Sequence, residues 1–176
     1  RLVDRTQSER GEDPPDVLYL DDAATELRRY AATAPTEDTA ATDRALLLYT
    51  AGTGAEPKAV AHTHAATWAA RSAAEHWLDA QEGDLVWTTS HAGWPDWLWH
   101  GVLGPWSVGA EVVIDDRAFD PEQRLDLLQR LAVTVLCQPP TEYRAIGKAG
   151  ANLPGALPRL RHTVSTGEAL EAGLVE

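Results

Sequence analysis

The chain has 176 residues, 44% hydrophobic and 24% charged, which is enough for one domain with a substantial core. A formal net charge of −12 excludes a broad basic face for nucleic acid, and no apolar run approaches the ~20 residues of a membrane span. The single cysteine, Cys137, excludes a disulfide framework or a cysteine metal site and favours a reduced, cytoplasmic setting.

The two ends of the chain do not look like natural ends. The chain begins with Arg1, contains no methionine, and its first residues lack the apolar central region of a signal peptide. We therefore expect a piece of a longer protein.

Residues 1–45 predict a lead-in to the main domain. A polar start is followed by a short strand over residues 17–20, a helix from Asp22 to Tyr30 and a polar linker over residues 31–43.

From residue 46 onward, strand patterns alternate with helix patterns. Such alternation predicts an α/β fold with a largely parallel sheet and helices on its faces. The run Leu46–Tyr49 has no polar alternation, which predicts a strand buried on both sides. Further strands are expected at 85–88, 110–114, 133–137 and 160–164, and helices at 62–79, within 94–108, from 121, and from a Thr141 cap to about 149.

Four of these strands run into unusual loops. The loops are the Gly/Thr-rich stretch after Tyr49, Ser90-His91, the stretch from Gln138 to Thr141, and Gly167-Glu168. Ligands of parallel sheets bind at the carboxyl ends of the strands. We therefore expect the four loops to form one site at one edge of one sheet.

The first loop, TAGTGAEPK, has the composition of a phosphate cradle. Glycines admit backbone N–H groups to phosphate oxygens, hydroxyls donate further hydrogen bonds, and Lys58 supplies a charge. The loop is neither a Walker A motif nor G-x-G-x-x-G, because Pro57 stands before the lysine. The alternatives are an ordinary strand-to-helix turn and a solvated surface lysine.

This loop resembles the signature of the adenylate-forming superfamily, roughly [YF]-T-S-G-T-T-G-x-P-K-G. By position, the resemblance implies that Thr50, Gly52, Thr53 and Lys58 hold the β- and γ-phosphates of ATP. The chain departs from the signature at Ala51, Gly54, Ala55 and Ala59, so two hydroxyl donors are missing.

Three later segments resemble the short- and medium-chain acyl-CoA synthetases of that superfamily. Gly93-Trp94 matches their Asp-x-Gly-Trp stretch, with His91 in place of the aspartate, and implies an acyl-pocket role for Trp94. The pattern V-T-x-x-x-x-x-P-T-x-x-R implies that Pro140 and Thr141 lie along the acyl and pantetheine tunnel. The strand followed by Gly167-Glu168-Ala169 implies that these three residues flank the adenine ring.

Plainer interpretations remain for several residues. A tryptophan such as Trp94 can pack the core, and Glu168 can be a first-turn acid favoured by the helix dipole. His62 and His64 lie two apart, which places them on different faces of a helix, so we expect no metal site. Cys137 is expected to be a buried strand residue and not a nucleophile.

As a whole, the resemblance implies that residues 46–176 are a partial AMP-binding domain within the large domain of an adenylate-forming enzyme. The implied ligase activates a carboxylic acid with ATP and transfers the acyl group to CoA. The resemblance places Mg²⁺ ligands and catalytic residues outside this chain, which alone would be inactive. The alternatives are a degenerate, non-catalytic binding module and an adenylation domain that loads a carrier protein.

Overall fold

A computed structural model describes residues 2–3, 18–19, 28–50, 56–150 and 157–171 of the chain. The chain divides into two compact units, residues 1–39 and residues 40–176. In the first unit, β1 (Leu2–Val3) pairs in parallel with β2 (Leu18–Tyr19), at the position of the predicted first strand. Most of the predicted helix from Asp22 lies outside the described residues.

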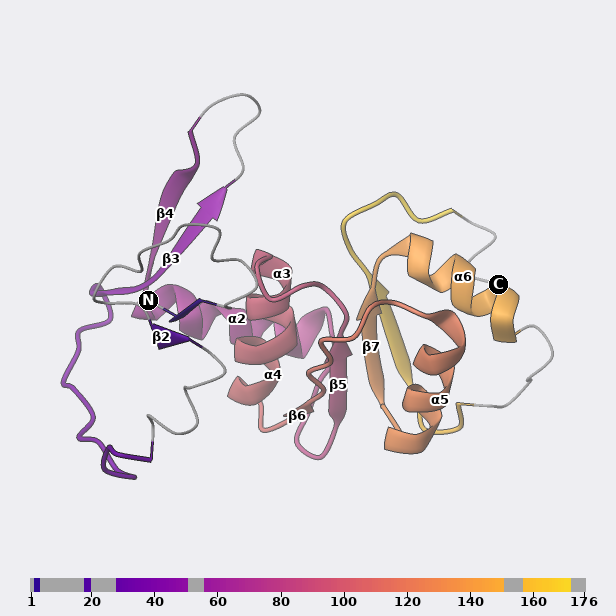
Figure 1. Cartoon of the computed structure of the whole chain (residues 1–176), viewed down its shortest axis with the longest axis horizontal. Helices are drawn as coiled ribbons and strands as arrows, with labels where there is room; N and C mark the ends of the chain where they lie inside the picture. Colours follow the sequence, from indigo (N-terminus) through magenta and orange to yellow (C-terminus); the bar gives the residue numbers. More distant parts are fainter. Residues whose placement is uncertain (1, 4–17, 20–27, 51–55, 151–156, 172–176) are drawn as a thin grey trace. The chain divides into compact units, whose positions relative to one another are not determined.

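A parallel sheet forms the centre of the second unit. Its strands are β5 (Leu85–Thr88), β6 (Glu111–Val112), β7 (Val135–Gln138) and β8 (His162–Ser165). They lie in the order β6-β5-β7-β8, and every neighbouring pair is parallel (Figure 1). The predicted parallel sheet is therefore confirmed, with strand ends shifted by one or two residues.

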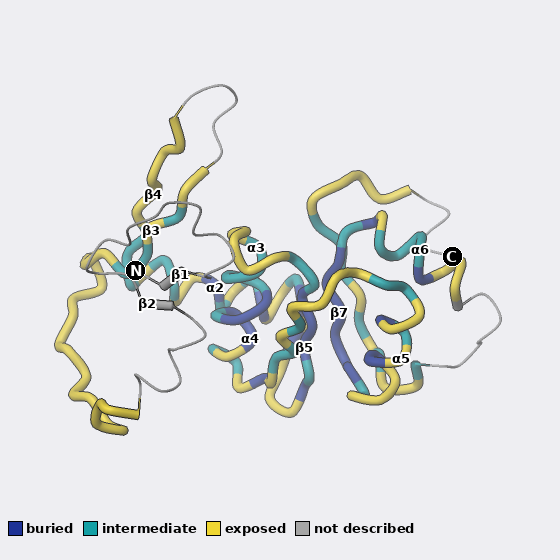
Figure 2. Tube along the Cα trace, in the orientation of Figure 1, coloured by how far each residue is buried: buried dark blue, intermediate teal, exposed yellow. Residues whose placement is uncertain are grey.

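Helices cover both faces of this sheet. The helix α2 (His64–His76) packs Ala74 against Val86 and Val135 on one face. On the other face, α5 (Pro121–Leu131) and α6 (Pro140–Gly150) pack with Trp87 and Leu136. Burial is greatest along β5 and β7, the two inner strands (Figure 2). Successive side chains of a strand point to opposite faces of the sheet. Val135 and Cys137 of β7 therefore pack in the core on the α2 side, and Leu136 packs in the core on the α5 and α6 side.

Local capping signals account for where these helices begin. The Asp120 side chain accepts a hydrogen bond from Gln123 N at 2.8 Å, and Pro121 occupies the first turn of α5 as predicted. Thr63 caps α2 by accepting from Ala66 N at 3.4 Å. The prediction of Thr141 as a cap is wrong, because α6 already begins at Pro140.

The Trp-rich segment after β5 is helical throughout. It consists of α3 (Pro95–Leu98), a π-helical turn η2 (Trp99–Leu103) and α4 (Gly104–Ser107). Gly104 lies so close to α2 that a Cβ on it would come within 3.1 Å of the Ala70 carbonyl oxygen. The close approach of the two helices therefore depends on a glycine at this position.

The structure corrects the interpretation of the first strand in this unit. Here β3 (Arg44–Thr50) pairs antiparallel with β4 (Lys58–Thr63), and the parallel sheet does not include either strand. Leu47 is 56% and Tyr49 66% exposed, so the predicted burial on both faces is wrong. An apolar run does not by itself reveal which other elements will cover it. Among the described residues, no element covers the side of the β3–β4 hairpin that carries Leu47 and Tyr49.

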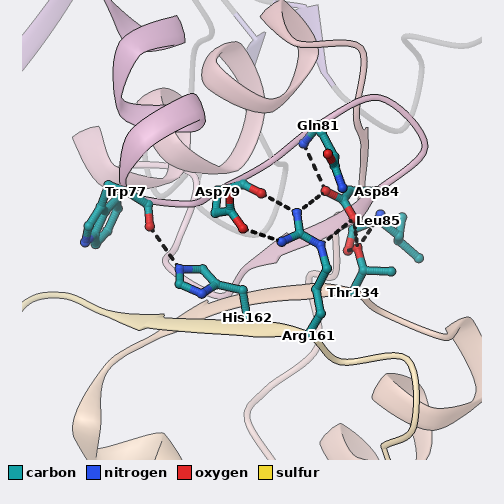
Figure 3. A network of polar contacts seen from close by, with 8 residues as sticks. All are labelled: Trp77, Asp79, Gln81, Asp84, Leu85, Thr134, Arg161 and His162. Atoms are coloured by element: carbon teal, nitrogen blue, oxygen red, sulfur yellow. Dashed lines mark hydrogen bonds and ion pairs between the residues drawn. The ribbon is translucent and has the colours of Figure 1, made fainter.

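A polar network joins three segments that precede β5, β7 and β8 (Figure 3). Arg161 donates from Nε to Asp84 Oδ1 at 3.1 Å, from Nη1 to Asp79 Oδ2 at 2.6 Å, and from Nη2 to Asp84 Oδ2. Thr134 Oγ1 donates to Asp84 Oδ1 at 2.8 Å and accepts from Leu85 N at 2.9 Å. The network closes the edge of the sheet opposite the strand-end loops.

Candidate functional site

A cavity of about 320 Å³ opens at the carboxyl ends of β5, β7 and β8. This is the edge at which parallel sheets bind ligands, and the volume lies within the range of small-molecule sites. Three of the four unusual loops meet here as predicted. The lining residues are Thr89, Ser90, His91, Trp94, Asp96, Pro139, Glu142, Thr166, Gly167 and Glu168.

The fourth loop, after Tyr49, is described only at its two ends, at Thr50 and at residues 56–58. It connects β3 to β4, and the chain continues through β4 before α2 begins. Thr50 and Lys58 face each other as the last pair of the hairpin, and Thr50 Oγ1 donates to Lys58 O at 3.4 Å. Neither lines the cavity, while Gly52 and Thr53 lie outside the described residues.

Three polar contacts organise the β8 side of the cavity. Thr166 Oγ1 donates to Asp96 Oδ2 at 3.3 Å, which joins the end of β8 to α3. Thr141 donates its hydroxyl to Glu168 Oε1, and Arg144 lies 4.0 Å from the same carboxylate. Gly167 has φ of 89°, a left-handed conformation that glycine adopts without strain. These contacts hold Gly167 and Glu168 at the rim.

A second cavity, of about 280 Å³, shares Thr89, Ser90, His91 and Glu142 with the first. The Glu142 carboxylate accepts from Thr89 Oγ1 at 2.7 Å and from Arg124 Nη1 at 3.4 Å. The Arg124 side chain is only 7% exposed and lies 4.4 Å from the Trp87 ring centroid. Burial lowers the pKa of Arg124, while the negative charge of Glu142 opposes that shift. Glu142 thus stands where the two cavities meet.

The structure brings together some of the predicted site residues. Trp94, Gly167 and Glu168 line the first cavity, and Trp94 is 64% exposed. Ala169 is exposed and does not line it. Pro140 is fully buried at the start of α6. Neither Pro140 nor Thr141 lines the cavity, although Pro139 and Glu142 on either side do.

The predicted role of Cys137 as a buried strand residue is confirmed. Its side chain is inaccessible in β7, and burial raises the pKa of its thiol to about 12. The thiolate is therefore absent at neutral pH. His62 packs edge-on against Trp99, with ring centroids 5.1 Å apart, and His64 begins α2. Across the described ranges, no three His, Cys, Asp or Glu side chains gather as a metal site would require.

Sequence reasoning missed Asp96, Arg124 and Glu142. Asp96 follows the Gly-Trp-Pro turn by one residue, and Glu142 follows Pro140-Thr141, so both adjoin motifs that were singled out. Proximity to a motif was the available signal. Arg124 had no such signal, because its helical position reads as the polar side of α5.

Comparisons with known proteins agree with this arrangement. The model of the family described as AMP-binding enzyme matches residues 2–176. An uncharacterised acyl-CoA ligase, YtcI, of Bacillus subtilis (strain 168) is 38% identical over 142 residues, covering 80% of this chain and 27% of its own length. The acetyl-coenzyme A synthetase of the same organism is 34% identical over 135 residues, and the alignment covers 76% of this chain and 24% of that synthetase.

A solved structure shows the same fold. The acyl-CoA synthetase of Brucella canis superposes with a TM-score of 0.79 at 24% identity, covering 96% of this chain and 30% of that one. The chain spans about a quarter of the length of the two curated relatives, YtcI and the acetyl-coenzyme A synthetase. Within the described residues, no helix is both long and apolar enough to cross a membrane.

Proposed function

This chain belongs to the AMP-binding enzyme family, and on that premise we propose that it is the acid- and nucleotide-binding part of an ATP-dependent acyl-CoA ligase. In the first step, a carboxylate oxygen attacks the α-phosphorus of ATP and displaces pyrophosphate, which leaves an acyl-adenylate. In the second step, the CoA sulfur attacks the acyl carbonyl carbon, its proton is lost to solvent, and AMP departs.

The observation that carries this proposal is the convergence of three strand-end loops on one cavity. The loop after β8 supplies Gly167 and Glu168, which with Ala169 we assign to the adenine side. The loop after β5 supplies Trp94 on the acyl side. Pro140 and Thr141 lie in the segment assigned to the path of the acyl and pantetheine groups, and it leads on to Glu142 between the two cavities.

The described residues would act by positioning their substrates. Nucleotidyl transfer depends mainly on orientation and charge neutralisation. We propose that the β- and γ-phosphates are held by Thr50, Gly52, Thr53 and Lys58, and that Lys58 supplies the neutralising charge. The described residues do not form a magnesium cage.

Calorimetric titration of MgATP into the Lys58→Ala variant tests the phosphate role. Loss of one charge-assisted contact should weaken binding by about 10-fold or more. The matched control is Lys148→Ala, which removes the chain's other lysine from an exposed position on α6 and should bind like the wild type. Equal binding by Lys58→Ala and wild type would refute the assignment.

A degenerate, non-catalytic binding module is the second candidate, favoured by Ala51 and Gly54 at positions where the family signature has hydroxyl residues. The double variant Ala51→Ser with Gly54→Thr distinguishes the two. A large gain in MgATP affinity on restoring both hydroxyls would favour degeneration. Unchanged affinity would show that the native loop is already competent.

A further inference from the structure

A polar bridge stands between the two cavities at the strand ends. Glu142, in the first turn of α6, lines both cavities, as does Thr89 directly after β5. The Glu142 carboxylate accepts a hydrogen bond from Thr89 Oγ1 at 2.7 Å and another from Arg124 Nη1 of α5 at 3.4 Å. These three residues, here called the Glu142 bridge, have a cavity of about 320 Å³ on one side and one of about 280 Å³ on the other.

The charged members of the bridge are held firmly in place. The side chain of Arg124 is 7% exposed and that of Glu142 is 18% exposed. The Arg124 guanidinium lies 4.4 Å from the ring centroid of Trp87 and 5.3 Å from that of Phe119. Separating such a pair would leave an uncompensated charge in a poorly solvated place, which is strongly unfavourable. The bridge therefore does not swing aside to admit a ligand.

The bridge is better suited to stop a ligand than to hold one. The opposite charges of Glu142 and Arg124 already compensate each other, so neither needs a charge from a substrate. An apolar chain lying across the bridge would strip water from both charged groups and offer no hydrogen bond in return. An acyl chain that occupies the first cavity therefore ends at Glu142.

The second cavity offers apolar surface on the far side of the bridge. Trp97, Ile114 and Phe119 line it, and Ile114 is 61% and Phe119 40% exposed. Of the charged groups that line it, Asp115 and Arg117 pair with each other at 2.6 Å. A methylene chain that reached this cavity would gain apolar contacts. The bridge, and not a lack of apolar surface beyond it, is what limits the first cavity.

We propose that the Glu142 bridge is the end wall of the acyl site and sets the longest straight-chain acid that the site accepts. This inference rests on the proposed function and narrows its substrate class to short, straight-chain carboxylic acids. Glu142 and Arg124 touch no reacting atom in this role. They determine specificity by excluding longer chains, which would have to cross a desolvated ion pair.

Binding of acids of increasing length tests the proposal. The probes are butanoate, hexanoate and octanoate, titrated calorimetrically into the chain as free acids and also as their 5′-O-(N-acylsulfamoyl)adenosines, which are stable analogues of the acyl-adenylates. Each methylene that enters an apolar site strengthens binding about 4-fold. Wild type should gain affinity from butanoate to hexanoate, and it should bind octanoate no more tightly than hexanoate.

The opened variant combines Glu142→Ala with Arg124→Leu, which removes the bridge without leaving a buried guanidinium unpaired. It should bind octanoate about 10-fold or more tightly than hexanoate, because the added methylenes enter the second cavity. Glu142→Ala alone is a second opened variant if the first is unstable. Glu142→Gln keeps the side-chain length and an acceptor for Thr89, so it should show the wild-type limit. Asp126→Ala, which truncates an exposed carboxylate on α5, should show that limit too.

The end wall and the ligase proposal fail separately in this experiment. The end wall is overturned if wild type binds octanoate about 10-fold more tightly than hexanoate, if the opened variants keep the wild-type limit, or if the chain binds none of the acids. Acylsulfamoyladenosines that bind no more tightly than the free acids would contradict the proposed function, while the free acids still decide the role of the bridge. Tighter binding of the adenosine analogues without a length limit would retain the ligase proposal and refute the end wall.

Discussion

Gln138 is the residue whose surroundings match its chemistry least well. It is fully buried at the end of β7, and neither polar atom of its amide has a hydrogen-bond partner within the described ranges. A buried polar group without a partner costs about 1–3 kcal/mol. A residue of this kind lowers stability unless a ligand or a further segment satisfies it.

We therefore expect Gln138→Met, which keeps the approximate volume, to raise the free energy of unfolding by about 1 kcal/mol or more in urea denaturation. Gln123→Met on the exposed side of α5 is the matched control and should change little. Destabilisation by Gln138→Met would show that the amide is satisfied in solution.

At the scale of elements, the end of α5 is set by one residue in an uncommon conformation. Ala132 terminates the helix with φ of 57° and ψ of 44°, and Val133 N donates back to Leu128 O at 3.1 Å. The left-handed region costs a residue with a Cβ about 1–2 kcal/mol, and glycine avoids most of that cost. Val133, which follows the turn, is buried in the core two residues before β7 begins.

Ala132→Gly should accordingly raise the unfolding free energy by about 0.5–1 kcal/mol, the balance between relief of strain and the added entropy of unfolded glycine. The same substitution at Ala145, inside the right-handed helix α6, should lower it by about 1 kcal/mol. Thermal or urea unfolding measures both. Changes of the same sign in the two variants would contradict the assigned conformation of Ala132.

For the second unit as a whole, the network around Arg161 connects segments far apart in sequence. Asp84 is buried, which by itself would raise its pKa, but hydrogen bonds from Arg161, the Gln81 backbone and Thr134 outweigh burial and lower the pKa below 3.8. Because the pKa is lower in the folded state, ionised Asp84 stabilises the fold at pH values above the pKa of the unfolded state. That stabilisation is lost as the pH falls through the folded pKa.

Asp84→Asn should thus lower the unfolding free energy by about 1–3 kcal/mol at pH 7, less than for a fully buried pair because Arg161 is 31% exposed. The difference from wild type should shrink below pH 3.8. Urea denaturation at several pH values measures this, with Asp126→Asn as an exposed control. A difference that stays constant down to pH 2 would refute the linkage.

Much of the fold could be predicted because its signals are local. Asp120 and Pro121 mark the start of α5 by capping chemistry, and β5 occupies the predicted residues 85–88. Short apolar strands that alternate with amphipathic helices bury both faces of the sheet when the strands pair in parallel and the helices cover them. The strand-end loops were predictable as a group for the same reason, since parallel strands end at one edge.

The first strand shows where local signals fail. Leu46–Tyr49 has the composition of a buried parallel strand, yet β3 pairs with β4 as an exposed antiparallel hairpin. Composition predicts that a strand will form, but the strand with which it pairs depends on residues elsewhere in the chain, here Lys58–Thr63 of β4. The expected roles of Gly52 and Thr53 fall on residues outside those described.

The sequence by itself thus determined the order of the elements from β5 onward, the start of α5 and the family, because each is encoded by neighbouring residues. It did not predict β4 or the start of α2 at His64. Only the tertiary structure decided how the cavity is charged. Asp96 contacts Thr166, 70 residues away in the sequence, and Arg124 contacts Glu142, 18 residues away. The residues flanking each partner carry no sequence pattern that predicts such a contact. Folding brings these charges together because strands from different parts of the chain end at the same edge.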